Sequence, residues 1–150
     1  MRIYVDTSVF GGCFDPEFEI WSNRIVDFFK IGKYKAVISE VSEFELKIAP
    51  KRIQQILLDI PKKNLEVTKL TDEAKQLSKH YIREKIVARK SLADTQHIAI
   101  ATVQQVDLLV SWNFKHIVNY DKIRLYNAAN LKYGYKFLEI RNPRDLTDEK

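Results

Sequence analysis

The sequence is poor in the residues that build disulfide frameworks and zinc sites. Its 150 residues include one cysteine and three histidines. Cys13 has no second cysteine with which to form an intrachain disulfide, and the histidines do not supply a zinc site at the usual ligand spacings. These absences favour a reducing compartment and exclude a fold that depends on disulfides or on structural zinc.

Long apolar runs are also missing. No segment approaches the roughly 18 consecutive apolar residues of a membrane-spanning helix. The opening residues, MRIYVDTSVFGG, lack the basic leader and apolar run of a secretory signal peptide. We therefore expect a cytoplasmic protein that has no membrane partner.

The composition is that of an ordinary globular domain. Hydrophobic residues make up 45% of the chain and charged residues 30%, and the chain is long enough to bury a sizeable core. We therefore expect one domain over residues 1–150. The formal net charge of +5 favours an anionic partner. By itself this charge is weak evidence, because Lys and Arg are common on protein surfaces.

Short apolar segments alternate along the chain with segments of helical periodicity. The first, Arg2–Asp6, ends in an acid and precedes Gly11 and Gly12, where we expect the backbone to turn. Strands that alternate with helices are joined by right-handed crossovers, so the sequence predicts an α/β fold with a mostly parallel sheet covered on both faces. The other predicted strands are 36–39, 108–110 and 135–140, with 65–70 as a connector or minor strand; the predicted helices lie between Pro16 and Gly32 and over 41–48, 53–60, 72–86, 91–105 and 123–133.

Four polar residues on separate segments are expected at one edge of this sheet. Asp6 ends the first predicted strand, and Asn113 comes just after a later one. Asp94 lies on or beside the packed face of its helix, three residues before His97. Glu45 projects from the second turn of another helix. In an open α/β sheet, ligands bind at the carboxyl ends of the strands, so the four residues can meet there.

Three of these residues, Asp6, Glu45 and Asp94, are acids. Clustered carboxylates without Cys or His partners suit a hard cation, and Mg²⁺ and Mn²⁺ prefer oxygen ligands. Such a cation can activate water and neutralise charge on a phosphodiester oxygen, as in-line hydrolysis of RNA or DNA requires. The basic residues that precede Asp94 are candidates to hold the polyanion: Lys79, Arg83, Lys85, Arg89 and Lys90.

Both helical acids also have a structural interpretation. Ser91 and Asp94 fit the first and fourth positions of a capping box, and so do Ser42 and Glu45. Glu43 is a competing choice of acid on the same helix as Glu45. The sequence alone leaves these alternatives open.

The remaining candidates differ in how well a structural role explains them. Asp6 is hard to explain in this way, because an acid that ends a buried strand costs several kcal/mol unless it is paired or metal-bound. Asn113 fits a turn. His97 is expected to pack, or to contact the ligands, rather than to bind metal itself, because the chain offers few nitrogen or sulfur partners. The basic residues also fit a solvated helix face.

Four segments, in this order and spacing, resemble the PIN-domain ribonucleases and most closely the VapC-like toxins of prokaryotic toxin–antitoxin pairs. The resemblance covers nearly the whole chain. The segments that carry it are VDTSVF with Asp6, ISEVSEFEL with Glu45, ADTQHIAIA with Asp94 and His97, and LVSWNFKHI with Asn113.

The resemblance implies a three-layer α/β/α PIN-like fold and Mg²⁺- or Mn²⁺-dependent endoribonuclease activity on RNA. It also implies frequent homodimers and a protein antitoxin that occupies the active site. Asp6, Glu45 and Asp94 match the acidic metal site of the family. Asn113 stands where many relatives carry an Asp. The number of bound metal ions, one or two, is therefore left open, and so is the strength of catalysis.

We therefore expect a PIN-type ribonuclease in which Asp6 and Asp94 bind the cation. Glu45 completes the site or orients water, and Asn113 helps to position water or phosphate. The leading alternative is a catalytically silent PIN-like module that binds RNA or a protein. A phosphoaspartate enzyme with Asp6 as nucleophile is disfavoured, because no second acid follows two residues later.

Overall fold

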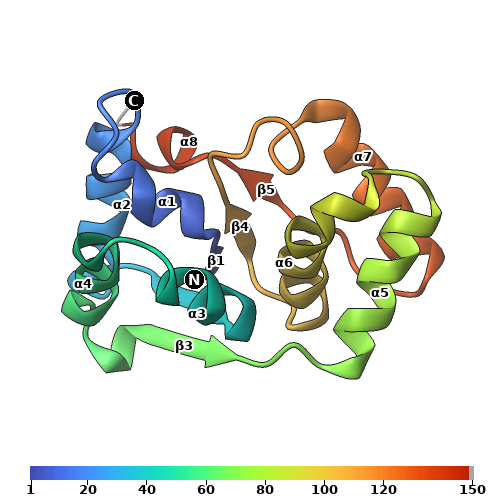
Figure 1. The fold of residues 1–150 in the computed structure, drawn as a ribbon, viewed down its shortest axis with the longest axis horizontal. Coiled ribbons are helices and arrows are strands. Elements are labelled where there is room, and N and C mark those ends of the chain that lie inside the picture. Colours follow the sequence, from blue (N-terminus) through green and yellow to red (C-terminus); the bar gives the residue numbers. More distant parts are fainter. Residues whose placement is uncertain (149–150) are drawn as a thin grey trace.

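The strands form one parallel sheet at the centre of the molecule. A computed structural model describes residues 1–148, and its sheet has the order β3-β2-β1-β4-β5 (Figure 1). All four strand pairings are parallel, which confirms the expected α/β class and the parallel sheet. The strands are β1 (Arg2–Val5), β2 (Lys35–Ser39), β3 (Leu65–Thr68), β4 (Leu108–Val110) and β5 (Ile140–Arg141).

Helices connect the strands and cover both faces of the sheet. In Figure 1, α1, α2 and α4 lie to the left of β1, β4 and β5, and α5, α6 and α7 lie to their right. The three layers confirm the predicted α/β/α arrangement. The α-helices are α1 (Thr7–Gly12), α2 (Glu19–Lys30), α3 (Glu40–Lys47), α4 (Lys51–Asp59), α5 (Asp72–Arg83), α6 (Leu92–Val103), α7 (Tyr120–Lys132) and α8 (Pro143–Thr147), and the 3-10 helices are η1 (Lys62–Asn64) and η2 (Arg89–Ser91).

The side chains of β1 show how the two cores form. Successive residues of a strand point to opposite faces of the sheet. Ile3 and Val5 join a core with α1 and α2, and Tyr4 between them joins a core with α5, α6 and α7. All three side chains are fully buried. A central parallel strand buried on both faces explains why this segment reads as a continuous apolar run.

The carboxyl edge of the sheet holds the polar residues that the sequence placed there. β1 ends at Val5, and the next residue, Asp6, donates its backbone N–H to the carbonyl of Val110 at 3.0 Å. β4 ends at Val110, three residues before Asn113. Asp6, which was predicted to end its strand, and Asn113, which was predicted to follow one, therefore both lie just beyond this edge.

The expected turn at Gly11 and Gly12 is wrong, because both glycines belong to α1. The physical reason lies in the packing of α1 against its neighbours. A Cβ on Gly12 would lie 2.5 Å from the Ser22 hydroxyl and 2.8 Å from the Trp112 indole nitrogen. Glycine is needed here for close approach and not for a turn.

The bounds of several elements also differ from the predictions. Pro16 lies in a turn, and α2 begins only at Glu19. α5 ends at Arg83, before Ile86, because Lys85 adopts a left-handed conformation with φ of 60° and the Ile86 N–H then bonds back to the Tyr81 carbonyl.

The predicted closing strand over 135–140 is too long, because β5 contains only Ile140 and Arg141. The side chain of Asn127 takes the place of a strand neighbour at Leu138. It accepts from the Leu138 N–H at 2.7 Å and donates to the Leu138 carbonyl at 3.0 Å. In addition, α7 begins at Tyr120, earlier than expected, because Asn119 caps it.

Within the described residues 1–148, no helix is long and apolar enough to cross a membrane.

Candidate functional site

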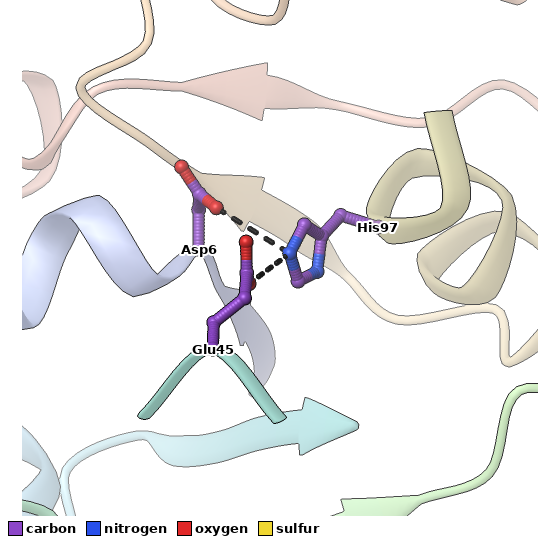
Figure 2. A group of neighbouring side chains, drawn as sticks. All are labelled: Asp6, Glu45 and His97. Atoms are coloured by element: carbon purple, nitrogen blue, oxygen red, sulfur yellow. Dashed lines mark hydrogen bonds and ion pairs between the residues drawn. The ribbon is translucent and has the colours of Figure 1, made fainter. Parts of the chain in front are cut away.

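A cavity of about 450 Å³ opens at the carboxyl edge of the sheet. The sequence-predicted residues Asp6, Glu45, Asp94 and Asn113 all line it, although they come from four separate segments. Figure 2 shows Asp6 and Glu45 pointing toward each other and toward His97. The other lining residues are Thr7, Ser8, Gly11, Gly12, Asp15, Phe18 and Trp112.

Asp6 is held in place by two serine hydroxyls. Ser8 and Ser111 each donate to its Oδ2 atom at 2.7 Å. The residue is only 6% exposed, so a buried carboxylate without these donors would be strongly destabilising. The other oxygen, Oδ1, lies 3.8 Å from Nε2 of His97. The two serines therefore fix the orientation of the carboxylate and leave Oδ1 toward the other acids.

Glu45 is the acid of α3 that faces the cavity. Its Oε1 accepts from the Thr7 hydroxyl at 2.8 Å and bonds to His97 Nε2 at 2.7 Å. Burial raises the pKa of Glu45, but the bonds from His97 and Thr7 outweigh burial and lower the pKa overall. Glu43 is exposed and lines a separate groove with Leu46. Of the two acids, Glu45 is therefore the one that faces the cavity.

His97 connects the acids to the core. Its ring is fully buried, and Nδ1 shares a 2.6 Å hydrogen bond with the Tyr4 hydroxyl, which also bonds to Ser39 at 2.7 Å. Burial lowers the pKa of His97, but the Tyr4 oxygen and the carboxylates of Glu45 and Asp6 outweigh burial and raise it. Protonated His97 donates from both ring nitrogens. The ring therefore holds Glu45 and balances part of the negative charge.

Asp94 enters the cavity from the first turn of α6. It is half-buried, and both this burial and the negative charge of Asp6 raise the pKa of its carboxyl above the ordinary range. Ser91, the N-cap residue of α6, makes no side-chain cap bond. The capping-box interpretation of Asp94 is therefore wrong.

The capping-box interpretation of Glu45 is wrong as well. The N-cap residue of α3 is Ser39, and its N–H donates to the hydroxyl of Ser42 at 3.1 Å. Ser42 is thus the fourth residue of the box and not the first. The hydrogen bonds of Glu45 go to Thr7 and His97, on other elements.

Asn113 takes part in a turn and also lines the cavity. Its Oδ1 accepts from the His116 N–H at 2.9 Å, and its own N–H donates to the Ser111 hydroxyl at 2.9 Å. With the carbonyl oxygen bound to the backbone, the amide NH₂ group is the end of this side chain that remains to donate.

The basic residues lie beside the site. Lys79, Arg83 and Arg89 line a cavity of about 640 Å³ together with Leu92. Lys90 is exposed on η2. Leu92 precedes Asp94 by two residues in the first turn of α6, so this turn separates the basic cavity from the acidic one.

The hydroxyl residues that hold the acids were not among the predicted site residues. Thr7 and Ser8 directly follow Asp6, and Ser111 follows β4, so a hydroxyl near each strand end was the available signal. Their importance depends on which carboxylate each one contacts, and the sequence does not contain this information. Asp15, Phe18 and Trp112 were also missed as cavity residues.

The carboxylates fit a divalent cation. One oxygen each of Asp6 and Glu45 lies within 4.8 Å of the other and of a ring nitrogen of His97. Asp94 lines the same cavity, and the lining includes no Lys or Arg among residues 1–148. Carboxylates gathered in this way repel one another unless a cation or a proton lies between them.

Solved structures share this fold, although no protein-family model and no curated protein matches the sequence. A chain of the VapBC2 complex from Rickettsia felis, bound to a DNA fragment from its promoter, aligns with a TM-score of 0.59 and 16% identity over 95% of this chain and 98% of that one. Mycobacterium tuberculosis VapC20, a toxin that cleaves the sarcin–ricin loop, aligns at 0.57 and 10% identity, covering 76% and 92%.

A toxin–antitoxin complex from Klebsiella pneumoniae gives a TM-score of 0.57 and 14% identity over 76% of this chain and 88% of that chain. At these identities the likeness concerns the fold. The expected PIN-like fold, similar to that of VapC toxins, is thereby confirmed.

Proposed function

We propose that this chain, whose fold is that of VapC toxins, is a metal-dependent endoribonuclease and the toxin of a toxin–antitoxin pair. One observation carries the proposal: Asp6, Glu45 and Asp94, from three separate elements, face one cavity at the carboxyl edge of a parallel sheet. Structural roles in capping, which were the alternative for two of these acids, are absent from residues 1–148.

Asp6, Glu45 and Asp94 would hold Mg²⁺ or Mn²⁺. A hard cation bound there supplies charge neutralisation at a phosphodiester oxygen and acidifies a bound water. His97 would act on the site through Glu45. Its Nε2 donates to Oε1 of that residue, so it orients the carboxylate and has no lone pair to offer an ion while protonated.

The remaining polar groups would position substrate and water. The amide NH₂ group of Asn113 can donate to water or to a phosphate oxygen, because its carbonyl oxygen is already bound to His116. The hydrogen bonds of Glu45 within residues 1–148 go to Oε1, so its second oxygen can accept a hydrogen bond from attacking water and orient it. Ser8 and Ser111 keep the Asp6 carboxylate oriented through these steps.

The basic cavity supports RNA as the substrate. Lys79, Arg83 and Arg89 line the basic cavity together with Leu92 of the first turn of α6, and Lys90 follows Arg89 on η2. Clustered cations of this kind hold a phosphate backbone by releasing its counterions. An RNA strand on these residues would reach the acidic cavity at Asp94.

The proposal extends to partners and compartment. We expect a protein antitoxin that covers the acidic cavity, a homodimer, and a cytoplasmic location. Two of the solved structures with this fold are toxin–antitoxin complexes, and a chain of one of them aligns with nearly the whole of this chain. This likeness supports the proposal of an antitoxin partner.

The test is cleavage of unstructured RNA in Mn²⁺ or Mg²⁺ and in chelator. We expect cleavage by the wild type only with metal, and a loss of at least about 100-fold in Asp6→Asn, because the cation loses its buried ligand. Asp59→Asn, on an exposed acid at the end of α4, is the matched control and should cleave like the wild type.

Two results would overturn the proposal. Equal cleavage in chelator would remove the metal from the reaction. Metal binding without cleavage of any RNA or DNA would favour a catalytically silent PIN-like module, and Asn113→Asp would then be the variant to examine for gained metal affinity.

A further inference from the structure

One end of the cavity has aromatic walls. Phe18 and Trp112 both line the cavity, and their rings stack with centroids 4.2 Å apart and planes inclined by 18°. The Trp112 indole N–H donates to the Ser22 hydroxyl at 2.8 Å, which fixes the ring. Phe114 is tilted against both rings at centroid distances of 6.3 and 6.1 Å. The metal-site chemistry uses none of these aromatic side chains.

Phe18 is the ring that remains open to the cavity. Trp112 is only 8% exposed, whereas Phe18 is half-buried and covers it. A rigid ring that supports a second, accessible ring beside a phosphate site is a suitable base-stacking platform, because every nucleobase has a π-face. The cavity of about 450 Å³ also falls within the usual range of small-molecule sites, roughly 300–1,000 Å³.

Asp15 gives this end of the cavity a hydrogen-bond acceptor. Its Oδ1 accepts from the Glu17 N–H at 2.9 Å, and no side-chain donor within residues 1–148 bonds to its Oδ2. The Phe18 N–H bonds to the Asp15 carbonyl at 2.9 Å, so the carboxylate and the ring belong to one turn. A carboxylate repels phosphate but accepts well from the exocyclic amino group of a base.

We propose that this end of the cavity is a nucleobase site, in which a base that has an exocyclic amino group stacks on Phe18 and donates to Asp15. The site rests on the proposed ribonuclease function, since it would hold the base next to the phosphate at the metal site. Cytosine, adenine and guanine have the required amino group, and uracil lacks it. Phe18 and Asp15 thus determine specificity and do not take part in the chemical step.

Trp112 provides a direct readout of the site. The chain has two tryptophans, so Trp21→Phe leaves Trp112 as the only one. In this background we expect cytidine 5′-monophosphate to quench the fluorescence in a saturable manner. Ribose 5-phosphate, which has the phosphate and no base, should not quench, and uridine 5′-monophosphate should bind about tenfold more weakly.

Variants of the two residues separate stacking from hydrogen bonding. Phe18→Leu keeps the apolar packing and removes the ring, so it should weaken cytidine monophosphate binding at least about fivefold, whereas Phe18→Tyr should retain it. Asp15→Asn should reduce the preference for cytidine over uridine. Phe137→Leu, on an exposed ring outside this cavity, is the matched control and should bind like the parent. Melting curves of each variant confirm that it is folded.

The outcomes distinguish the base site from the ribonuclease proposal. Quenching that depends on Phe18, in a protein that cleaves no RNA, would support the base site and refute the ribonuclease. If the wild type cleaves RNA but Phe18→Leu binds cytidine monophosphate as tightly as the parent does, the base site is refuted and the ribonuclease proposal stands. Equal binding of ribose 5-phosphate and cytidine monophosphate would also refute it.

Discussion

At the scale of single residues, Asp94 allows a test of the metal site through stability as well as through activity. Its raised pKa means that the ionised carboxylate is less favourable in the folded protein than in the unfolded chain. In chelator, Asp94→Asn should therefore leave the free energy of unfolding unchanged or raise it by up to about 1 kcal/mol at neutral pH. The same variant should lose any stabilisation by Mg²⁺ or Mn²⁺.

The size of the stability change in Asp94→Asn should depend on pH, and melting curves can measure this dependence. The unfavourable contribution of Asp94 is absent at low pH, where the carboxyl is protonated, and grows as pH rises through the raised pKa. The gain from Asp94→Asn should therefore vanish in acid. A clear loss of stability in chelator at neutral pH, with cleavage retained, would contradict the catalytic assignment.

His97 makes a second prediction through its pairing with Glu45. Because the pKa of His97 is raised above its ordinary value of 6.5, its contribution to stability is complete below about pH 6.5 and falls as pH rises above it. Glu45 has a lowered pKa, so its contribution is present above 4.5 and is lost in acid. In chelator, His97→Gln should lower stability by roughly 2 kcal/mol between these pH values, and by less at higher pH.

Melting curves of the wild type and His97→Gln across the pH range provide the measurement. Tyr4→Phe is the companion variant, because it removes one hydrogen bond to His97 and leaves the charge pair with Glu45 intact. Its effect on stability should also decrease as pH rises above about 6.5, because the Tyr4 oxygen contributes to the raised pKa of His97. A difference between wild type and His97→Gln that grew toward alkaline pH would show that the buried imidazole is neutral.

Among the secondary-structure elements, α1 allows a test of whether Gly12 is needed for close approach. Gly12→Ala should lower the free energy of unfolding by about 1 to 3 kcal/mol, because the new methyl group would displace the hydrogen-bonded pair of Ser22 and Trp112. Gly11→Ala is the matched control in the same helix. Its Cβ would meet only the Ile53 side chain at 3.9 Å, so it should raise stability by about 0.4 to 1 kcal/mol. Denaturant unfolding measures both, and equal effects would contradict the close-approach argument.

The basic residues of α5 and η2 make a prediction about binding. If Lys79 and Arg83 contact phosphates, replacing both with Gln should flatten the slope of log affinity for RNA against log salt by about 1 to 2 units. Lys62→Gln with Lys63→Gln is the matched control, because η1 precedes β3 and lies at the amino-terminal edge of the sheet. An unchanged slope in the α5 variant would show that these residues form a solvated helix face and do not contact RNA phosphates.

At the scale of the whole molecule, a bound cation should stabilise the fold. An ion that binds only the folded state, at about 100 times its dissociation constant, adds roughly 2.7 kcal/mol. For a domain of this size the melting temperature should then rise by roughly 5 to 10 °C. Asp6→Asn should abolish the rise, and NaCl at matched ionic strength is the control. No shift at any Mg²⁺ or Mn²⁺ concentration would contradict the metal site.

The class of fold, and the edge of the sheet that carries the site, could be predicted from the sequence. Alternation of apolar runs with helical periods requires a parallel sheet with helices on both faces, and the end of each strand is visible as a change from apolar to polar residues. Asp6 and Asn113 could therefore be placed at one edge without any structure. The choice of acids on helices was less certain, because Asp94 and Glu45 each fit a local capping pattern equally well.

The contacts between these side chains could not be predicted, because they depend on tertiary packing. The bond between His97 and Glu45 joins residues 52 positions apart, and the bond between Ser111 and Asp6 joins residues 105 apart. Such contacts depend on how each helix is rotated and docked on the sheet, and local periodicity does not specify these properties. The same holds for Gly12, because the sequence shows a residue suited to turns, and only packing against other elements makes it a residue of close approach.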